Sequence, residues 1–244
     1  MAQGRIACML GGGFEDSEFR IPYDRLRKEG FQVDIIGPKA GMELKGYKGK
    51  ETVKADKGID EVRPEDYLGL LIPGGQSPDH LRVDQRFVEF VKRFDALKRP
   101  IAAVCHGPQL LLSARLVRGR TLTAWPTVQV DLELAGANVK DQPVVIDQNW
   151  ITSRKPEDLE QFSEAFIQAL RKAERVAPED ADYEHDAEGP DDMPSHIRAA
   201  FTRTTETIPI RDGSLLLGTW QAIYLWEHRR SPHRRHLVVT VVGV

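Results

Sequence analysis

The chain has little cysteine: Cys8 and Cys105 are the only two in 244 residues. Two cysteines cannot build the disulfide framework of a small secreted domain, and a thiolate-rich zinc site needs three or four cysteine ligands. The sequence therefore excludes both of these protein classes. Low cysteine use is typical of proteins in a reducing compartment, so we expect a cytoplasmic location.

Long apolar runs and a strong net charge are also lacking. No run approaches the roughly 20 residues that a spanning helix needs, and "MAQGRIACMLGGG" has too short an apolar core for a signal peptide. A net charge of −3 gives no reason to expect binding to nucleic acid or to anionic membranes. The composition, 41% hydrophobic and 29% charged, is that of a soluble globular protein.

A dinucleotide-binding glycine pattern is missing as well. Gly11 to Gly13 form a glycine-rich turn, but the G-x-G-x-x-G spacing with a ribose-binding acid downstream is absent. We therefore expect no nucleotide. We also expect no metal or other cofactor, because the cysteine chemistry considered below needs none.

What the first 170 residues do contain is a regular alternation of short apolar runs and amphipathic segments. The strand candidates are residues 5–10, 32–37, 68–75, 101–105 and 144–153. The helical patterns between and after them cover residues 15–30, 84–99, 107–119 and 157–173. Continuous apolar strands separated by helices predict an α/β fold, a parallel sheet covered on both faces in a three-layer sandwich.

The composition changes near residue 173. The stretch "ERVAPEDADYEHDAEGPDD" holds nine acidic residues in nineteen and predicts a solvated linker. Beyond it, "MPSHIRAAFTR" favours a short helix, and strand patterns follow with Asp212-Gly213 as a hairpin turn. We therefore predict a main domain at 1–172, a linker at 173–192 and a small β-rich module at 193–244. Some 50 residues make a thin core, so this module should pack on the first domain or on another subunit.

The stretch "RPIAAVCHGPQLLLSARLVRG" places Cys105 where a buried strand ends and a helix begins. Ligands of open parallel sheets bind beyond the carboxyl ends of the strands. The partial positive charge of a helix N-terminus, and the imidazole of His106, should lower the pKa of the thiol and make it a nucleophile. Cys8, in the middle of a strand, is expected to be an ordinary core residue.

Two glycine-rich turns follow other strands and should reach the same pocket. "GGGFEDSEF" brings Glu15, and "IPGGQSPDHLR" brings Asp79, so that a carboxylate could face either the thiol or the imidazole. Glu18 is interpreted as a first-turn acid that favours the helix dipole. The default for Asp79 is a solvated turn residue.

Three of these stretches together resemble the DJ-1/PfpI superfamily, with its intracellular proteases and general stress proteins. They are "FEDSEF", "LLIPGGQSPDHLR" and "AVCHGPQLLLSARLVRGRTLTA", and the resemblance runs from about Arg5 to Leu170. It implies a flavodoxin-like sandwich that assembles as a dimer or hexamer.

The resemblance also implies roles for individual residues. Cys105 would be the nucleophile, with His106 beside it and Glu15 as the carboxylate that approaches the sulfur. Gly75 and the backbone N–H of His106 would line an oxyanion hole. Asp79 matches an acid that reaches His106 from a neighbouring subunit, although glutamate is common at that position.

The chemistry implied is that of peptidases, of cofactor-independent glyoxalases or of deglycases acting on glycated amines. Physical reasoning favours a small carbonyl substrate or a glycated protein: the thiolate adds to an aldehyde, and Glu15 moves a proton between adjacent carbons. The alternatives are a peptidase or amidase, and a redox sensor or chaperone whose Cys105 oxidises to a sulfinate. The tail could also make the protein a scaffold subunit.

The tail itself resembles the latter half of the YjbQ family over roughly Tyr183 to Val244. The N-terminal half of that family, with its histidine- and glutamate-bearing motif, has no counterpart, so we expect packing or oligomer contacts rather than a second activity. His185 and His196 are interpreted as surface residues rather than metal ligands. The basic run at 228–236 is interpreted as a solvated hairpin loop.

Overall fold

The structure is a computed structural model, and it describes residues 3–174, 210–211 and 214–215. Residues Met1–Glu174 form one compact unit and Arg175–Val244 a second. The predicted helix after residue 192, His185, His196 and the basic run at 228–236 all lie outside the described residues. None of the described helices is long and apolar enough to cross a membrane.

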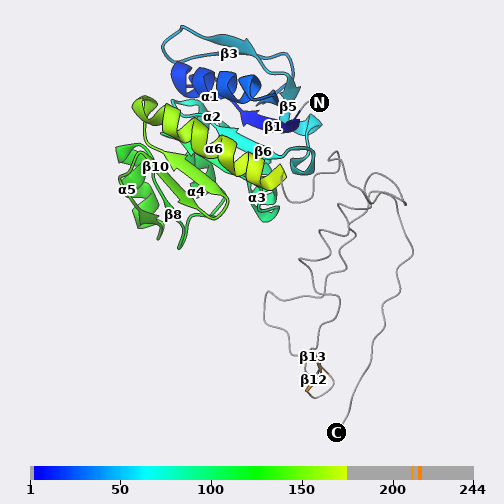
Figure 1. The fold of residues 1–244 in the computed structure, drawn as a ribbon, viewed down its shortest axis with the longest axis vertical. Coiled ribbons are helices and arrows are strands. Elements are labelled where there is room, and N and C mark those ends of the chain that lie inside the picture. Colours follow the sequence, from blue (N-terminus) through cyan, green and yellow to red (C-terminus); the bar gives the residue numbers. More distant parts are fainter. Residues whose placement is uncertain (1–2, 175–209, 212–213, 216–244) are drawn as a thin grey trace, which may run out of the picture. The chain divides into compact units, whose positions relative to one another are not determined.

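The first unit is built on a seven-stranded sheet with the order β10-β11-β7-β6-β1-β2-β5 (Figure 1). Its strands are β1 (Gln3–Met9), β2 (Phe31–Gly37), β5 (Lys57–Gly58), β6 (Gly69–Ile72), β7 (Ile101–Val104), β10 (Val144–Asp147) and β11 (Trp150–Ser153). All neighbouring pairs are parallel except β10 and β11. The predicted α/β sandwich with a mostly parallel sheet is confirmed.

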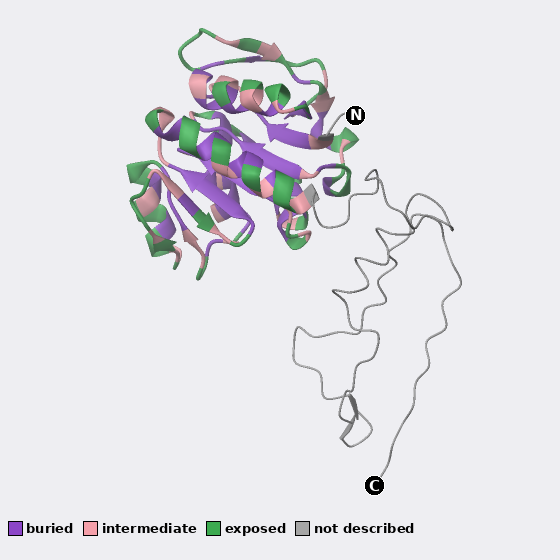
Figure 2. Ribbon diagram, viewed as in Figure 1, coloured by how far each residue is buried: buried purple, intermediate pink, exposed green. Residues whose placement is uncertain are grey.

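Helices cover both faces of this sheet. α1 (Asp16–Lys28) and α6 (Leu159–Glu174) pack on one face, and α3 (Gln85–Ala96), α4 (Pro108–Ser113) and α5 (Pro126–Leu134) on the other. The core therefore consists of two apolar clusters, one on each side of the sheet, and the strands between them are buried along most of their length (Figure 2).

The remaining elements are short. β3 (Glu43–Lys45) and β4 (Thr52–Lys54) form an antiparallel hairpin, while β8 (Thr121–Leu122) and β9 (Asn138–Val139) form a parallel pair. α2 (Ser77–Leu81) follows β6, and single 3₁₀ turns occur at Ile59–Glu61, Pro64–Asp66 and Pro156–Asp158. In the second unit, β12 (Ile210–Arg211) and β13 (Ser214–Leu215) pair antiparallel, as the predicted hairpin requires.

The structure corrects the sequence prediction in three places. The single strand expected at 144–153 is a hairpin, because the chain reverses at Gln148, whose φ is +55°. The helix expected at 107–119 ends at Ser113, and Arg115 has a φ of +58° that a helix cannot continue through. Helix α5 was not predicted.

Candidate active site

Cys105 occupies a sharp turn between β7 and α4. Its φ is +61°, a left-handed conformation that costs a residue with a side chain roughly 1–2 kcal/mol. The turn also needs Gly107, because a Cβ there would lie 2.5 Å from the Ile72 carbonyl oxygen. Pro108 then opens α4, where its missing N–H does no harm. This strand–turn–helix geometry holds the thiol at the carboxyl edge of the sheet, as predicted.

Several hydrogen-bonding groups converge on the sulfur. Sγ of Cys105 lies 3.2 Å from Nδ1 of His106, and the backbone N–H groups of Gly75 and His106 both donate to it. Gly75 has a φ of +73°, and a Cβ there would lie 2.4 Å from the backbone nitrogen of Glu15. The two N–H groups predicted to line an oxyanion hole therefore lie at the thiol, which is itself only 6% exposed. Their role in stabilising an oxyanion stays a prediction.

The carboxyl group beside the thiol belongs to Glu18, whereas Glu15 was predicted there from the sequence. Glu18 is fully buried, its Oε2 accepts the backbone N–H of Gly74, and its carboxyl group interacts directly with the Cys105 thiol. A Cβ on Gly74 would lie 2.4 Å from Oε2 of Glu18 and 2.8 Å from Cβ of Cys105, so only glycine fits between the two groups.

Glu18, and not Glu15, lies beside the thiol because of the residue at which α1 begins. Glu15 is the N-cap residue, and its side chain turns back to accept the N–H of Glu18 at 2.9 Å. Glu15 also accepts hydrogen bonds from Ser17 and from the ammonium of Lys48, both at 2.5 Å. Glu18, almost one helical turn further on, faces the sheet edge. The interpretation of Glu18 as a mere first-turn acid was therefore wrong.

The buried Glu18 and Cys105 titrate as a coupled pair. Burial raises the pKa of Glu18 to about 8, and the nearby charge of Glu15 adds to this. Burial and the Glu18 charge also raise the pKa of the Cys105 thiol, whereas the N–H groups of Gly75 and His106 lower it. A lowered thiol pKa was expected from the sequence, because the helix N-terminus and the imidazole are visible there and burial is not. At neutral pH the Glu18 carboxyl is protonated and, because its own pKa is raised, so is the Cys105 thiol, so the pair carries no charge.

His106 is neutral at pH 7, because burial lowers the pKa of its imidazole. The charge of Asp79 acts in the opposite direction on the same pKa. Asp79 is exposed and forms an ion pair with Arg82 at 3.1 Å. Its proposed reach to His106 of a neighbouring subunit, and self-association itself, stay predictions.

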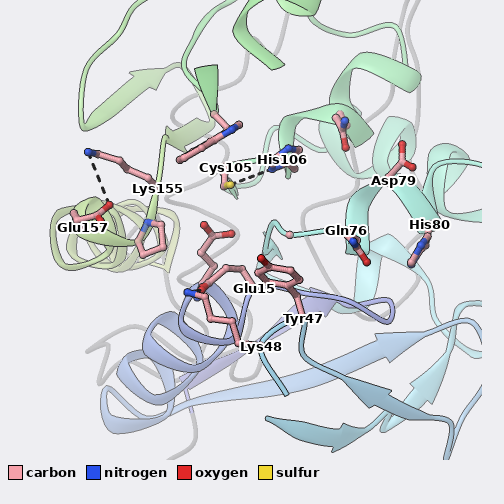
Figure 3. A pocket seen from close by; sticks show the side chains of 15 residues that line it. Glu15, Tyr47, Lys48, Gln76, Asp79, His80, Cys105, His106, Lys155 and Glu157 are labelled. Carbon is pink, nitrogen blue, oxygen red and sulfur yellow. Dashed lines mark hydrogen bonds and ion pairs between the residues drawn. The ribbon is translucent and has the colours of Figure 1, made fainter. Parts of the chain in front are cut away.

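These groups line a pocket of about 880 Å³ (Figure 3). Cys105, His106 and Glu15 face it, and so do four residues that were not predicted from the sequence: Tyr47, Lys48, Gln76 and Lys155. Trp125 also lines it, with its ring stacked 6.3 Å from that of His106. No sequence motif marks Tyr47 or Lys48, since both belong to the loop that joins β3 to β4.

Asp16 explains how that loop is held. Its carboxylate accepts the backbone N–H groups of Lys48, Lys50 and Glu51 at 2.7–2.9 Å. Gly46 passes so close that a Cβ would lie 2.5 Å from Oδ1 of Asp16. Among the described residues, no cluster of three histidine, cysteine, aspartate or glutamate side chains is arranged to hold a metal ion.

A parallel α/β sandwich with a cysteine at a strained strand end defines the class of this protein. The family model described as DJ-1/PfpI family matches residues 4–169, and the chain belongs to that family. A second model, described as UPF0047 protein YjbQ-like, matches residues 160–244 and therefore begins within α6. Both resemblances expected from the sequence are confirmed.

Curated relatives cover the same part of the chain. Protein/nucleic acid deglycase 2 of Escherichia coli is 47% identical over 167 residues, which are 68% of this chain and 97% of the relative. General stress protein 18 of Bacillus subtilis is 43% identical over 169 residues, covering 69% of this chain and 98% of the relative.

Solved structures share the fold. A two-domain protein of Anabaena variabilis with DJ-1/ThiJ/PfpI-like and ferritin-like domains has a TM-score of 0.68 and 35% identity; the match covers 69% of this chain and 48% of that one. Drosophila melanogaster DJ-1beta has a TM-score of 0.63 and 23% identity over 72% of this chain and 97% of its own.

Proposed function

We propose that the protein is a cysteine-dependent enzyme that acts on reactive carbonyls, converting methylglyoxal to lactate and releasing the same group from glycated adducts. The observation that carries this is the pairing of Cys105 with a buried, protonated carboxyl group, Glu18, within reach of two backbone N–H donors. The named activity of the Escherichia coli relative, a deglycase, supports the same substrate class.

The first step forms a carbon–sulfur bond. The reactive form of the site has lost one of its two protons. As the Cys105 sulfur attacks the aldehyde carbon, the remaining proton passes from the sulfur to Glu18, and the electron pair of the carbonyl moves to its oxygen. The N–H groups of Gly75 and His106 stabilise the charge on that oxygen, which then takes the proton held by Glu18. The product is a hemithioacetal beside an ionised Glu18.

The second step moves hydrogen between neighbouring carbons. The Glu18 carboxylate removes the proton from the former aldehyde carbon, which gives an enediol, and returns it to the adjacent carbon, while the hydroxyl proton passes to the second oxygen. The first carbon is oxidised by two electrons and the second is reduced by two, so no external oxidant is needed. Water then hydrolyses the resulting thioester, which releases lactate and restores the Cys105–Glu18 pair with its one proton.

Peptide hydrolysis is less well supported by the geometry. A cysteine peptidase needs an acid that orients the histidine. Within the described residues of one chain, the ring of His106 makes a hydrogen bond to Cys105 and to no carboxylate. A small electrophile that requires only the thiol, Glu18 and backbone donors therefore fits this site better.

The test is lactate formation from methylglyoxal by the full-length protein, without glutathione and with a phosphine reductant. We expect Cys105→Ala to lose at least roughly 10³-fold and Glu18→Gln about 10²-fold, because each removes a group that acts on the reacting atoms. Cys8→Ala is the matched control and should stay within about 2-fold. A wild-type protein with an intact Cys105 thiol that forms no lactate would contradict the proposal.

The proposed action on glycated adducts needs a separate experiment. The substrate is the hemithioacetal that methylglyoxal forms with the free thiol of a cysteine whose amino and carboxyl groups are blocked. The rate of lactate formation is compared with the rate at which that adduct dissociates by itself. A faster enzymatic rate supports direct action on the adduct. A rate limited by spontaneous dissociation restricts the activity to free methylglyoxal.

A further inference from the structure

Glu15 and Lys48 form an ion pair at the pocket that the proposed mechanism does not use. Oε1 of Glu15 lies 2.5 Å from Nζ of Lys48, and the Glu15 side chain is almost fully buried while that of Lys48 is half exposed. Figure 3 shows the pair on the α1 side of the pocket, opposite Cys105 and His106. A buried carboxylate held this firmly requires an explanation beyond surface charge.

We propose that the Glu15–Lys48 ion pair is a positioning device that acts through Glu18 and sets the pH at which the Glu18–Cys105 pair loses its proton. Both residues are positioning residues, because neither touches the sulfur or the reacting atoms. Their influence on turnover rests on the function proposed above, but their influence on Glu18 does not.

The choice of residue at the helix start supports this role. Serine, threonine, aspartate and asparagine are the usual N-caps, because their short side chains reach the N–H groups of the first turn. Glu15 makes that capping bond with Oε2 and reaches Lys48 with Oε1. The longer side chain thus fixes the backbone of Glu18 and brings a negative charge close to it at the same time.

Lys48 is held in place from the other side. Its own backbone N–H is one of the three that Asp16 accepts, so the loop that carries the Lys48 side chain is fixed beside the start of α1. The hydrogen bond to Glu15 raises the pKa of Lys48, and bonds from Lys48, Ser17 and Glu18 outweigh burial and keep the pKa of Glu15 low. The pair therefore stays ionised around neutral pH.

The groups that act on Glu18 have opposite signs. Burial and the charge of Glu15 raise its pKa, whereas Cys105, the N–H of Gly74 and the charge of Lys48 lower it. Because the charge of Glu15 acts on Glu18 more strongly than that of Lys48, the pair as a whole favours the protonated form. Removing one member of the pair should then shift the pKa of Glu18 in one direction, and removing the other member in the opposite direction.

The experiment is a ¹³C NMR titration of the glutamate side-chain carboxyl carbons, with the Glu18 signal assigned by its loss in Glu18→Gln. We expect Glu15→Gln to lower the titration midpoint of Glu18 by about one pH unit, because it removes the nearest negative charge. Lys48→Met should raise the midpoint by about half a unit. Lys45→Met and Glu43→Gln, an exposed pair on β3, are the matched controls and should leave it unchanged.

Opposite shifts in the two variants support the proposal, since a general loosening of the site would move both midpoints the same way. Unchanged midpoints, or shifts in the same direction, overturn it. If Glu15→Gln does not fold, Lys48→Met alone decides, because it leaves the N-cap intact: an upward shift supports the proposal and any other result overturns it. The titration needs no turnover, so its outcome is independent of whether lactate is formed. Where turnover is measured, its pH profile should shift with the Glu18 midpoint.

Discussion

The protein places its two described cysteines in two kinds of strand environment. Cys8 lies inside β1, between Ile35 of β2 and Leu71 of β6 in the ladder, and is fully buried. Cys105 lies just past the end of β7 at a φ of +61°, almost as well buried. Burial raises the pKa of both thiols. What differs is the presence of donors, a neutral carboxyl and a pocket at Cys105, so environment rather than residue type makes Cys105 the candidate nucleophile.

Thiol alkylation should separate the two environments most strongly. We expect iodoacetamide to modify Cys105 through the pocket, whereas Cys8 becomes accessible only when the sheet opens, which requires most of the global free energy of unfolding. The ratio of the two rates should exceed about 10⁴, measured by mass spectrometry of the two cysteine peptides. Equal rates would mean that the interior of β1 is open to solvent.

Gly75→Ala should displace the Gly75 N–H from the Cys105 sulfur, because the backbone must shift to make room for the new side chain. The new Cβ would meet the backbone of Glu15, and a φ of +73° disfavours alanine, so we expect a loss of about 3–4 kcal/mol in the free energy of unfolding. Urea denaturation measures it. Gly12→Ala is the control, since nothing lies within 4 Å of the position that its new methyl group would take, and should change stability by less than about 0.5 kcal/mol.

Glu18→Gln should change how the free energy of unfolding depends on pH, which tests the neutral carboxyl beside Cys105. The pKa of Glu18 is about 8 in the folded protein and 4.5 in the unfolded chain. Below pH 4.5 the carboxyl is protonated in both states, so it does not lower the free energy of unfolding. From there through pH 8 that free energy falls, because the unfolded chain loses the proton and the folded protein keeps it. The variant should therefore be more stable than the wild type by about 4–5 kcal/mol near pH ~8.5, with little difference near pH ~4.5. Glu160→Gln, an exposed residue, is the control. A gain that does not depend on pH would refute the assignment.

Asp79→Asn should have the smallest effect. Asp79 acts on His106 only through its charge, so its loss should lower the pKa of the imidazole slightly and change lactate formation by less than about 3-fold. Steady-state kinetics around pH 6 give the most sensitive test. A loss above roughly 10-fold would instead indicate direct contact with His106 across subunits, as the family resemblance implies.

The parts of the fold that depend on local pattern could be predicted from the sequence. Five apolar runs and the amphipathic stretches between them identify the sheet and its main helices, because burial on both faces leaves a continuous apolar signature. The turn at Gln148 leaves no such signature, since its positive φ is adopted by a residue other than glycine. The short β3–β4 hairpin has too few apolar residues to show an alternation.

Only part of the site could be predicted from the sequence, again because only local patterns can be recognised there. Cys105, His106 and Gly75 are fixed by the strand-to-helix turn and its neighbour, which are visible as motifs. The choice between Glu15 and Glu18 depends on which residue caps α1, and a helix start cannot be located to one residue from sequence. Lys48 reaches the pocket through the buried Asp16 network, a tertiary contact without a local sequence signal.

Trp125 gives the molecule a built-in optical probe. Its backbone N–H donates to the Cys105 carbonyl oxygen at 2.9 Å, and its indole is stacked on the imidazole of His106. A protonated imidazole quenches indole emission more strongly than a neutral one. The emission of Trp125, identified by its absence in Trp125→Phe, should therefore change when His106 takes up a proton and when a ligand binds to the neighbouring sulfur. Both events can be followed in real time and without a label.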